Sequence, residues 1–142
     1  AKDMLISVIS DNDSQVRIQA VKGSASLNHK KAVQPLIEFI SQEGFKKFEF
    51  AEKKEFFEAL GKLGANEVVS FLKNIYTKRP WFSRSAYEEL RICAIYGLSK
   101  TGTDDALSVL QGLKGKPGSK IENIRLRAIT EIKNSMGRPA SP

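Results

Sequence analysis

The chain has 142 residues, of which 41% are hydrophobic and 27% are charged, a balance typical of a folded domain rather than a disordered segment. No apolar run approaches the length that a membrane helix needs, so we expect no membrane span. One cysteine and one histidine exclude an internal disulfide, most metal sites and most nucleophile–histidine pairs. We therefore expect a protein that is not an enzyme and that binds no metal, cofactor or small-molecule substrate. We expect it to reside in a reducing compartment such as the cytoplasm.

The net charge of +7 is unevenly distributed along the chain. Residues 1–71 contain 10 basic and 10 acidic side chains, whereas residues 72–142 contain 13 basic and 6 acidic ones. This asymmetry favours a basic surface that faces an acidic partner. The alternative is a solvated surface that keeps the protein soluble.

Apolar residues recur at helical spacing through almost the whole chain, and no alternating run between turns indicates a strand. The first predicted helix resembles the second helix of an incomplete hairpin. After the last predicted helix, residues 137–142 are predicted to be a loose tail. The lack of an initiator methionine suggests a domain from a longer protein. The predicted helices are 3–10, 14–24, 30–42, 48–63, 66–77, 86–100, 104–113 and 120–136.

Several polar residues stand where helices are expected to begin. Asp13, Asn28 and Thr103 are suitable N-caps, because a short polar side chain can accept a hydrogen bond from an unpaired backbone N–H group. Ser85 and Ser119 each precede a glutamate by three residues, the spacing of a capping box. These signals support helix starts near these positions.

A repeated pattern runs through the chain, anchored on four alanines whose successive spacings are 39, 35 and 34 residues. Each anchor is followed by a large apolar residue, and in three copies an arginine stands three residues before it, whereas Phe56 takes that place in the second copy. We expect the anchors to be buried at hairpin contacts and the arginines to form a ladder that bonds adjacent turns, a structural role. The anchors are Ala20, Ala59, Ala94 and Ala128, and the arginines are Arg17, Arg91 and Arg125.

A second helix follows the first three anchors at matching offsets, with the rhythm of a helix that buries one stripe. The residues 12 past the anchor are Ala32, Phe71 and Ala106, those 13 past are Val33, Leu72 and Leu107, and those 16 past are Leu36, Ile75 and Leu110. The unit is therefore a helical hairpin, and the repeats span about 13–42, 48–77 and 86–113, followed by a final helix at 120–136. We expect residues 1–136 to form one domain.

This pattern resembles the HEAT-repeat family, in particular its short bacterial helical-hairpin repeats, over roughly residues 13–133. The best copies are Leu90–Leu98 with Ala106–Leu110, and Val16–Ala20 with Ala32–Ile37. The resemblance implies an all-α, right-handed α-solenoid of about three to four hairpins. It also implies macromolecular scaffolding rather than catalysis.

Two segments depart from the family pattern. Residues 45–54 form an insertion of aromatics and lysines, and the connection at 78–85 is long. The second carries three cations around two aromatics: Lys78, Arg79, Trp81, Phe82 and Arg84. The aromatics could plug the gap between hairpins, anchor a protein partner, or stack on bases while the cations contact phosphates.

A second basic group, Lys114, Lys116 and Lys120, precedes the last predicted helix. Successive inter-repeat connections of a solenoid emerge at one edge, so we expect this group and the cations of the 78–84 segment to form one basic stripe. Such a stripe suits an acidic protein segment or a polyanion.

The leading functional hypothesis is a protein–protein interaction scaffold, with the second helices on the concave face of the solenoid. The alternative is nucleic-acid binding by the basic C-terminal half, with an affinity that falls as salt rises. Cys93 is expected to be a quiet core residue, since no base stands near it in the repeat. The predicted exposed residues of the concave face are Lys31, Gln34, Glu38, Lys73, Asn74 and Ser108.

Overall fold

The computed structural model describes residues 7–64, 66–78 and 84–137. These residues form helices and connections and contain no strand, so the all-α prediction is confirmed. The helices are α2 (Ser14–Ser26), α3 (Val33–Ile40), α4 (Phe50–Leu63), α5 (Asn66–Thr77), α6 (Arg84–Ser99), α7 (Asp104–Gly112) and α8 (Lys120–Ser135), with the 3-10 turns η1 (Lys30–Ala32) and η2 (Glu43–Lys47). Residues 3–6 of the predicted helix at 3–10 lie outside the described residues, while 7–9 are helical. Of the predicted tail at 137–142, only residue 137 is described.

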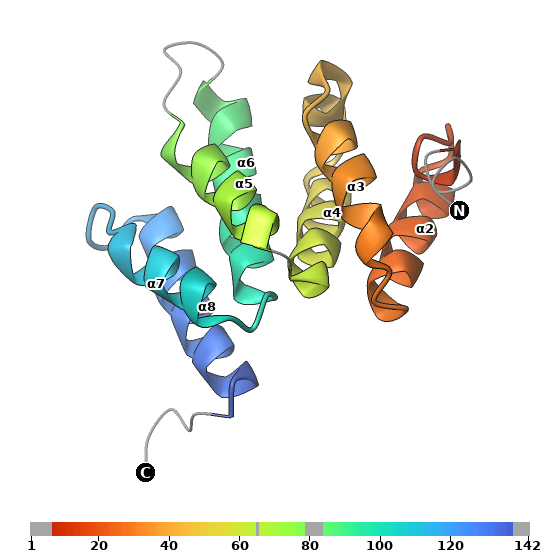
Figure 1. Ribbon diagram of the computed structural model, residues 1–142. Coiled ribbons are helices and arrows are strands. Elements are labelled where there is room, and N and C mark those ends of the chain that lie inside the picture. Colours follow the sequence, from red (N-terminus) through yellow and green to blue (C-terminus); the bar gives the residue numbers. More distant parts are fainter. Residues whose placement is uncertain (1–6, 65, 79–83, 138–142) are drawn as a thin grey trace.

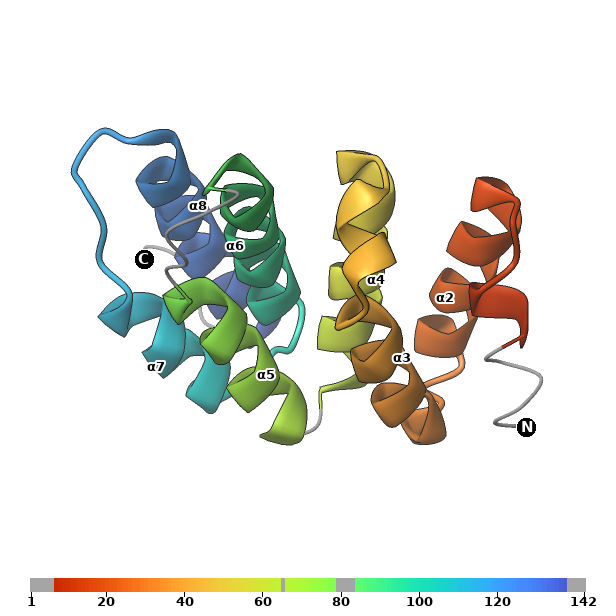
Figure 2. The ribbon, with the colours of Figure 1, turned by 90° about the horizontal axis from the view of Figure 1, so that it is seen from above.

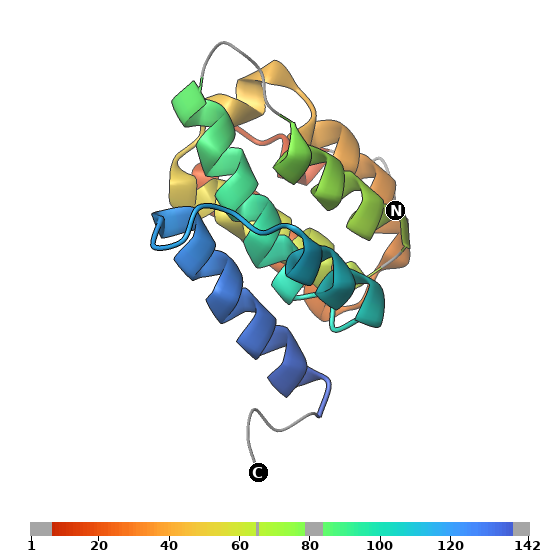
Figure 3. The same ribbon diagram turned by 90° about the vertical axis from the view of Figure 1, so that its left-hand side faces the viewer.

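The helices form two layers, as Figures 1 and 2 show. The first helices of the hairpins, α2, α4, α6 and α8, make one layer in which each helix packs against the next. The second helices, α3, α5 and α7, make the other. Viewed from the C-terminal end of the stack, α6 and α8 lie together in the first layer while α5 and α7 lie beside them in the second (Figure 3). This arrangement is the helical-hairpin solenoid that the repeat predicts.

The predicted register of the repeat is largely confirmed. Ala59, Ala94 and Ala128 are buried at the contacts between first-layer helices, with 3%, 0% and 2% of their surface exposed. Ala20 is only partly buried, although it packs against the core. Small residues at these positions let neighbouring helices approach closely.

The closest approach is between α4 and α6, which touch backbone to backbone. A Cβ added at Gly61 would lie 2.0 Å from the carbonyl oxygen of Gly97, and one added at Gly97 would lie 2.9 Å from that of Phe57. Both distances are too short for any side chain, so the two helices need glycine at this crossing. We refer to this contact as the glycine seam.

The helix starts are mostly as predicted. The side chains of Asp13, Thr103 and Ser119 accept hydrogen bonds from backbone N–H groups in the first turns of α2, α7 and α8. The prediction for Ser85 is wrong, because α6 already begins at Arg84 and Ser85 lies within its first turn.

The prediction that Asn28 is an N-cap is also wrong, because Asn28 follows the end of α2. Its φ is 52°, in the left-handed region that asparagine tolerates better than most residues. Its N–H donates to the carbonyl of Ala25, and the N–H of His29 donates to that of Ser24, both at 3.0 Å. These two bonds form a Schellman motif, which satisfies carbonyls that the helix end leaves unpaired.

The three repeat arginines each bond an adjacent turn, as predicted for the ladder, and they do not bond to one another. In each copy of the repeat, a cation from a first-layer helix donates instead to a carbonyl at the end of the preceding segment. These carbonyls lie at or near the ends of segments, where a positive charge also offsets the negative end of a helix dipole. The four contacts, which we call clasps, are Arg17 to Asp11 (2.7 Å), Lys53 to Lys46 (3.1 Å), Arg91 to Lys78 (3.2 Å) and Arg125 to Leu110 (2.5 Å).

Lys53 explains the copy that lacks the arginine. Phe56 occupies the arginine position there and is fully buried, while Lys53, one turn earlier, makes the clasp. Lys53 also pairs with Glu89 of α6 at 2.6 Å, although only 2% of its side chain is exposed. The cation is therefore displaced by one turn in this hairpin, and its role is kept.

Arg17 makes a further, bidentate contact with Glu52 of α4, at 2.6 Å from Nε and 2.8 Å from Nη2. Both side chains are buried, and the hydrogen bonds to Glu52 raise the pKa of Arg17 against the effect of burial. The pair joins α2 to α4, and the glycine seam joins α4 to α6. Both contacts lie in the first layer.

The insertion in the family pattern runs from the end of η2 to the start of α4 and supplies aromatic side chains to the core. Phe45 is 2% exposed, and its ring lies 5.5 Å from Phe56 and 5.6 Å from Phe48. Phe39 of α3 stacks on Phe56 at 5.2 Å. The extra residues therefore build a cluster of rings that fixes the connection between the first two hairpins.

The second layer is less continuous than the first. α5 packs mainly against α6 and also contacts α7, whereas α3 packs against α4 and has no extensive contact with α5. The layer that was predicted to form one continuous face is therefore divided between α3 and α5. All the residues predicted to be exposed on it are exposed: Lys31, Gln34, Glu38, Lys73, Asn74 and Ser108.

Candidate functional site

A groove of about 330 Å³ opens where the second layer is divided. One wall comes from the end of α3 and from η2, the other from α5, and the first turns of α6 close one end. We call it the α3–α5 groove. It is lined by Ile40, Ser41, Glu43, Lys46, Phe71, Asn74, Ile75, Lys78, Tyr87 and Leu90.

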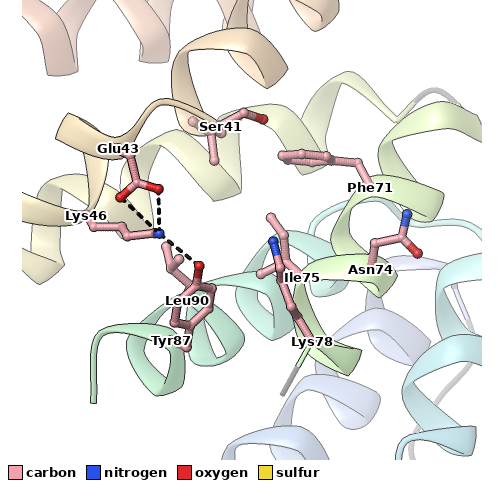
Figure 4. A pocket seen from close by; sticks show the side chains of 10 residues that line it. Ser41, Glu43, Lys46, Phe71, Asn74, Ile75, Lys78, Tyr87 and Leu90 are labelled. Atoms are coloured by element: carbon pink, nitrogen blue, oxygen red, sulfur yellow. Dashed lines mark hydrogen bonds and ion pairs between the residues drawn. The ribbon is translucent and has the colours of Figure 1, made fainter. Parts of the chain in front are cut away.

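Phe71 and Ile75 make the groove wall apolar, and Figure 4 shows both side chains projecting into it from α5. At the position of Phe71 the other hairpins have Ala32 and Ala106, each fully buried. Phe71 itself is only half-buried. A large ring therefore stands in the groove at a repeat position that elsewhere carries a small core residue.

The position of Ile75 shows the same contrast. Its equivalents, Leu36 and Leu110, have no exposed surface, whereas Ile75 is half-buried. Apolar side chains at core positions of a repeat are expected to leave water. Here two neighbouring ones stay partly in contact with it.

Lys46 and Tyr87 lie on the opposite side of the groove from Phe71 and Ile75 (Figure 4). The Lys46 ammonium group donates to the Tyr87 hydroxyl at 2.9 Å and to the Glu43 carboxylate at 3.2 Å. It also lies 4.4 Å from the centroid of the Tyr87 ring. The hydrogen bond to Tyr87 raises the pKa of Lys46, and Glu43 adds to this, whereas burial acts in the opposite direction.

A second ammonium group, that of Lys78, lies 5.8 Å from the centroid of the same Tyr87 ring. Lys78 follows the last residue of α5 and is exposed. Two cations thus flank one buried ring at the end of an apolar groove, so the local field there favours an anion.

The structure describes only part of the basic segment predicted as a binding site. Arg79, Trp81 and Phe82 lie outside the described residues. Lys78 and Arg84, which bound them, are exposed. Of the described residues of this segment, Lys78 lines the groove and Arg84 does not.

The second basic group is exposed as predicted. Lys114, Lys116 and Lys120 lie in or beside the connection from α7 to α8, which is the loop at the left of Figure 1. Arg84 begins α6, which packs directly on α8, so Arg84 and Lys120 stand at the starts of neighbouring helices. Whether these cations act as one stripe stays a prediction.

Glu122 and Arg125 lie below that connection and fix its shape. Arg125 pairs with Glu122 in a bidentate contact, with both bonds at 2.7 Å, and Glu122 accepts a third bond from the backbone N–H of Gly115 at 2.9 Å. Arg125 is the main reason that the pKa of Glu122 is lowered to about 2. These two residues are committed to structure.

Cys93 is buried in α6 and unsuited to chemistry. It has no exposed surface, and burial raises the pKa of its thiol to about 12. Such a thiol is not ionised at neutral pH, and the thiolate is the reactive form. Among the residues that the structure describes, no group of three or more His, Cys, Asp or Glu side chains is arranged to hold a metal ion.

A family profile for HEAT repeats matches residues 2–91. The chain belongs to the HEAT-repeat family. The match covers the first two hairpins, the groove between α3 and α5, and the first half of α6, and the remaining hairpin repeats the same pattern. HEAT repeats are generally protein-interaction scaffolds. No curated protein matches the sequence, and no described helix is both long and apolar enough to cross a membrane.

Most of this groove was not predicted from the sequence, which proposed Asn74 on the exposed face and Lys78 as a binding cation. One signal was present: Phe71 stands where the other copies have alanine. The insertion was a second signal, since it supplies Lys46. Neither signal says which side chains meet, because Tyr87 reaches Lys46 from a point 41 residues further along the chain.

Proposed function

We propose that this HEAT-repeat protein is a non-catalytic scaffold that binds an extended segment of a protein partner in the α3–α5 groove. One observation carries the proposal: Phe71 and Ile75 are half-buried in the groove, although their repeat equivalents are fully buried. A bound segment would complete the burial that these positions have elsewhere in the stack. Partly exposed apolar groups with polar groups around them are typical of protein-binding surfaces.

The size of the groove suits a peptide segment better than a folded domain. Ligand sites begin at roughly 300 Å³, so a groove of about 330 Å³ holds one large side chain and the backbone beside it. A folded partner would need a broader contact, of roughly 800 Å² per side. The exposed residues beside the groove, such as Lys73 and Asn74, could contribute to such a contact.

Photo-crosslinking tests the proposal. A photoreactive residue replaces Asn74 in the groove or, as a control, Ser108 on the exposed face of α7, and each variant is irradiated in a lysate of the native host. We expect Asn74 to yield a discrete protein adduct that survives nuclease treatment and is lost when Ile75→Asp is added. Equal adducts at both positions, or none at Asn74, would refute binding in the groove.

A second candidate function is polyanion or nucleic-acid binding through the basic C-terminal half. Its specific support is that Lys114, Lys116 and Lys120 are exposed and that none of them has an ion pair in the described part of the chain. Phosphate contacts of this kind weaken steeply as salt rises. The cations at 78, 79 and 84 would extend the surface.

Heparin and duplex DNA retention at low salt separates this candidate from the first. We expect reversal of Lys114, Lys116 and Lys120 to glutamate to remove any retention and to leave crosslinking at Asn74 intact. If the unmodified protein is not retained on either matrix, the basic half serves solubility alone.

A further inference from the structure

We propose that the α3–α5 groove selects a peptide segment in which an acidic residue adjoins a large apolar side chain. The inference rests on the proposed function, since it names the chemistry of the partner at the same groove. It combines two halves of the site: an apolar wall on α5 and a pair of cations around Tyr87.

The apolar half sets the first requirement. Phe71 and Ile75 face the groove, and Ile40 and Leu90 add to its lining. Burying apolar surface gains about 25 cal/mol per Å², so filling this space with an aromatic or branched aliphatic side chain is the main favourable step. A polar side chain there would lose its water without gaining a partner.

The cationic half sets the second requirement. Lys46 and Lys78 lie 4.4 and 5.8 Å from the centroid of the Tyr87 ring. Among the groove-lining residues the only carboxylate is that of Glu43. The groove therefore has an excess of positive charge, and a carboxylate on the partner complements it.

Glu43 shows where such a carboxylate would sit. It binds Lys46 at 3.2 Å, yet 91% of its side chain is exposed, so the pair is of the kind that contributes little to stability. Lys46 is mostly covered, with 22% of its side chain exposed, and is held in place by Tyr87. A partner carboxylate can therefore replace Glu43 on a cation that is already positioned.

The same geometry disfavours a nucleobase. Stacking requires an open ring face, and Lys46 covers the Tyr87 ring at 4.4 Å. Phe71 is the other ring in the groove, and it stands across the groove from both Lys46 and Tyr87. A peptide side chain that needs only an apolar surface fits this arrangement better.

Three synthetic peptides test the two requirements separately. The first is acetyl-Ser-Asp-Phe-Asp-Ser-Gly-amide, the second has lysine in place of both aspartates, and the third has alanine in place of phenylalanine. Each is titrated to millimolar concentration into the ¹⁵N-labelled full chain. We expect only the first to bind well, with shifts centred on Phe71, Ile75 and Tyr87, and at least about tenfold more tightly than either of the others.

Variants assign the selectivity to residues. Lys78→Gln, at an exposed position, should reduce binding of the acidic peptide about threefold to tenfold and weaken its salt dependence. Lys116→Gln removes one exposed lysine that does not line the groove and should change neither. Ile75→Asp should abolish binding of all three peptides, with the melting temperature of each variant recorded alongside.

The outcomes separate this inference from the proposed function. If the acidic and basic peptides bind equally well in the groove, the charge preference is wrong and the scaffold proposal stands. If no peptide shifts the groove resonances but Asn74 still crosslinks to a protein, the acidic–apolar motif is wrong while groove binding survives. If Asn74 yields no adduct as well, both are wrong.

Discussion

The glycine seam joins α4 to α6 in the first layer, whereas the α3–α5 groove lies in the second layer, and the two are built in opposite ways. At the seam, Gly61 and Gly97 bring two backbones into contact and leave room for no side chain. At the groove, Phe71 and Ile75 carry large apolar side chains that the neighbouring helix does not cover. The stack is thus held together through one layer, which leaves the other free to contact a partner.

The largest effect on stability is expected where the first layer depends on a buried ion pair. Glu52→Gln should lower the free energy of unfolding by about 3–5 kcal/mol, because it leaves the buried Arg17 guanidinium without its counter-charge. Urea denaturation measures this difference. Glu38→Gln, at an exposed position, should change it by less than about 0.5 kcal/mol.

The glycine seam itself is tested by Gly61→Ala. Overpacking against the Gly97 carbonyl should cost about 3 kcal/mol, and the better helix propensity of alanine should return about 1 kcal/mol. Gly23→Ala is the matched control, since no atom lies within 4 Å of a Cβ at that position. A Gly61→Ala protein as stable as the Gly23→Ala protein would contradict backbone contact at the seam.

Acid stability tests whether the α7–α8 connection is held as firmly as the seam. The pKa of Glu122 is lowered from an ordinary 4.5 to about 2, so ionised Glu122 stabilises the fold above pH 4.5. That contribution falls as the pH drops from 4.5 to about 2. Melting curves across this range should therefore lose less stability on acidification for Glu122→Gln than for the unmodified protein. Parallel curves would exclude the ion pair as the cause.

The smallest effect is expected in the groove. Ile75→Ala should cost about 1 kcal/mol, because the side chain is only half-buried. Leu110→Ala, at the equivalent position of the next hairpin, should cost about 2–5 kcal/mol, since Leu110 is fully buried. Equal losses in the two variants would mean that Ile75 is a core residue, and the contrast between seam and groove would fail.

The sequence predicted the helices and their register well, because a repeat states the same core pattern several times. It predicted Ala59 and Ala94 as buried contacts, and it did so from spacing alone. The carbonyl acceptors of the clasps were not predicted, because the arginine position identifies a donor but not its acceptor. Lys53 replaces that donor from another turn, which no fixed offset reveals.

The groove was harder to predict for a different reason. It depends on how α3, α5 and the start of α6 are placed relative to one another after packing. Gly97 is part of the quoted repeat pattern, but its closeness to Gly61 is a property of the packed helices. Tyr87 and Lys46 meet only after that packing exists, so local sequence patterns could not indicate their contact.

The clasps bear on how the molecule comes apart. Each joins the end of one segment to the helix that follows, so every hairpin is coupled to its nearest neighbour and to no other through these bonds. In such a linear array, loss of structure spreads from an end inward, one coupling at a time. Hydrogen exchange should therefore show α7 and α8 opening together through Arg125, while α4 and α6, joined by both Lys53 and the glycine crossing, exchange last.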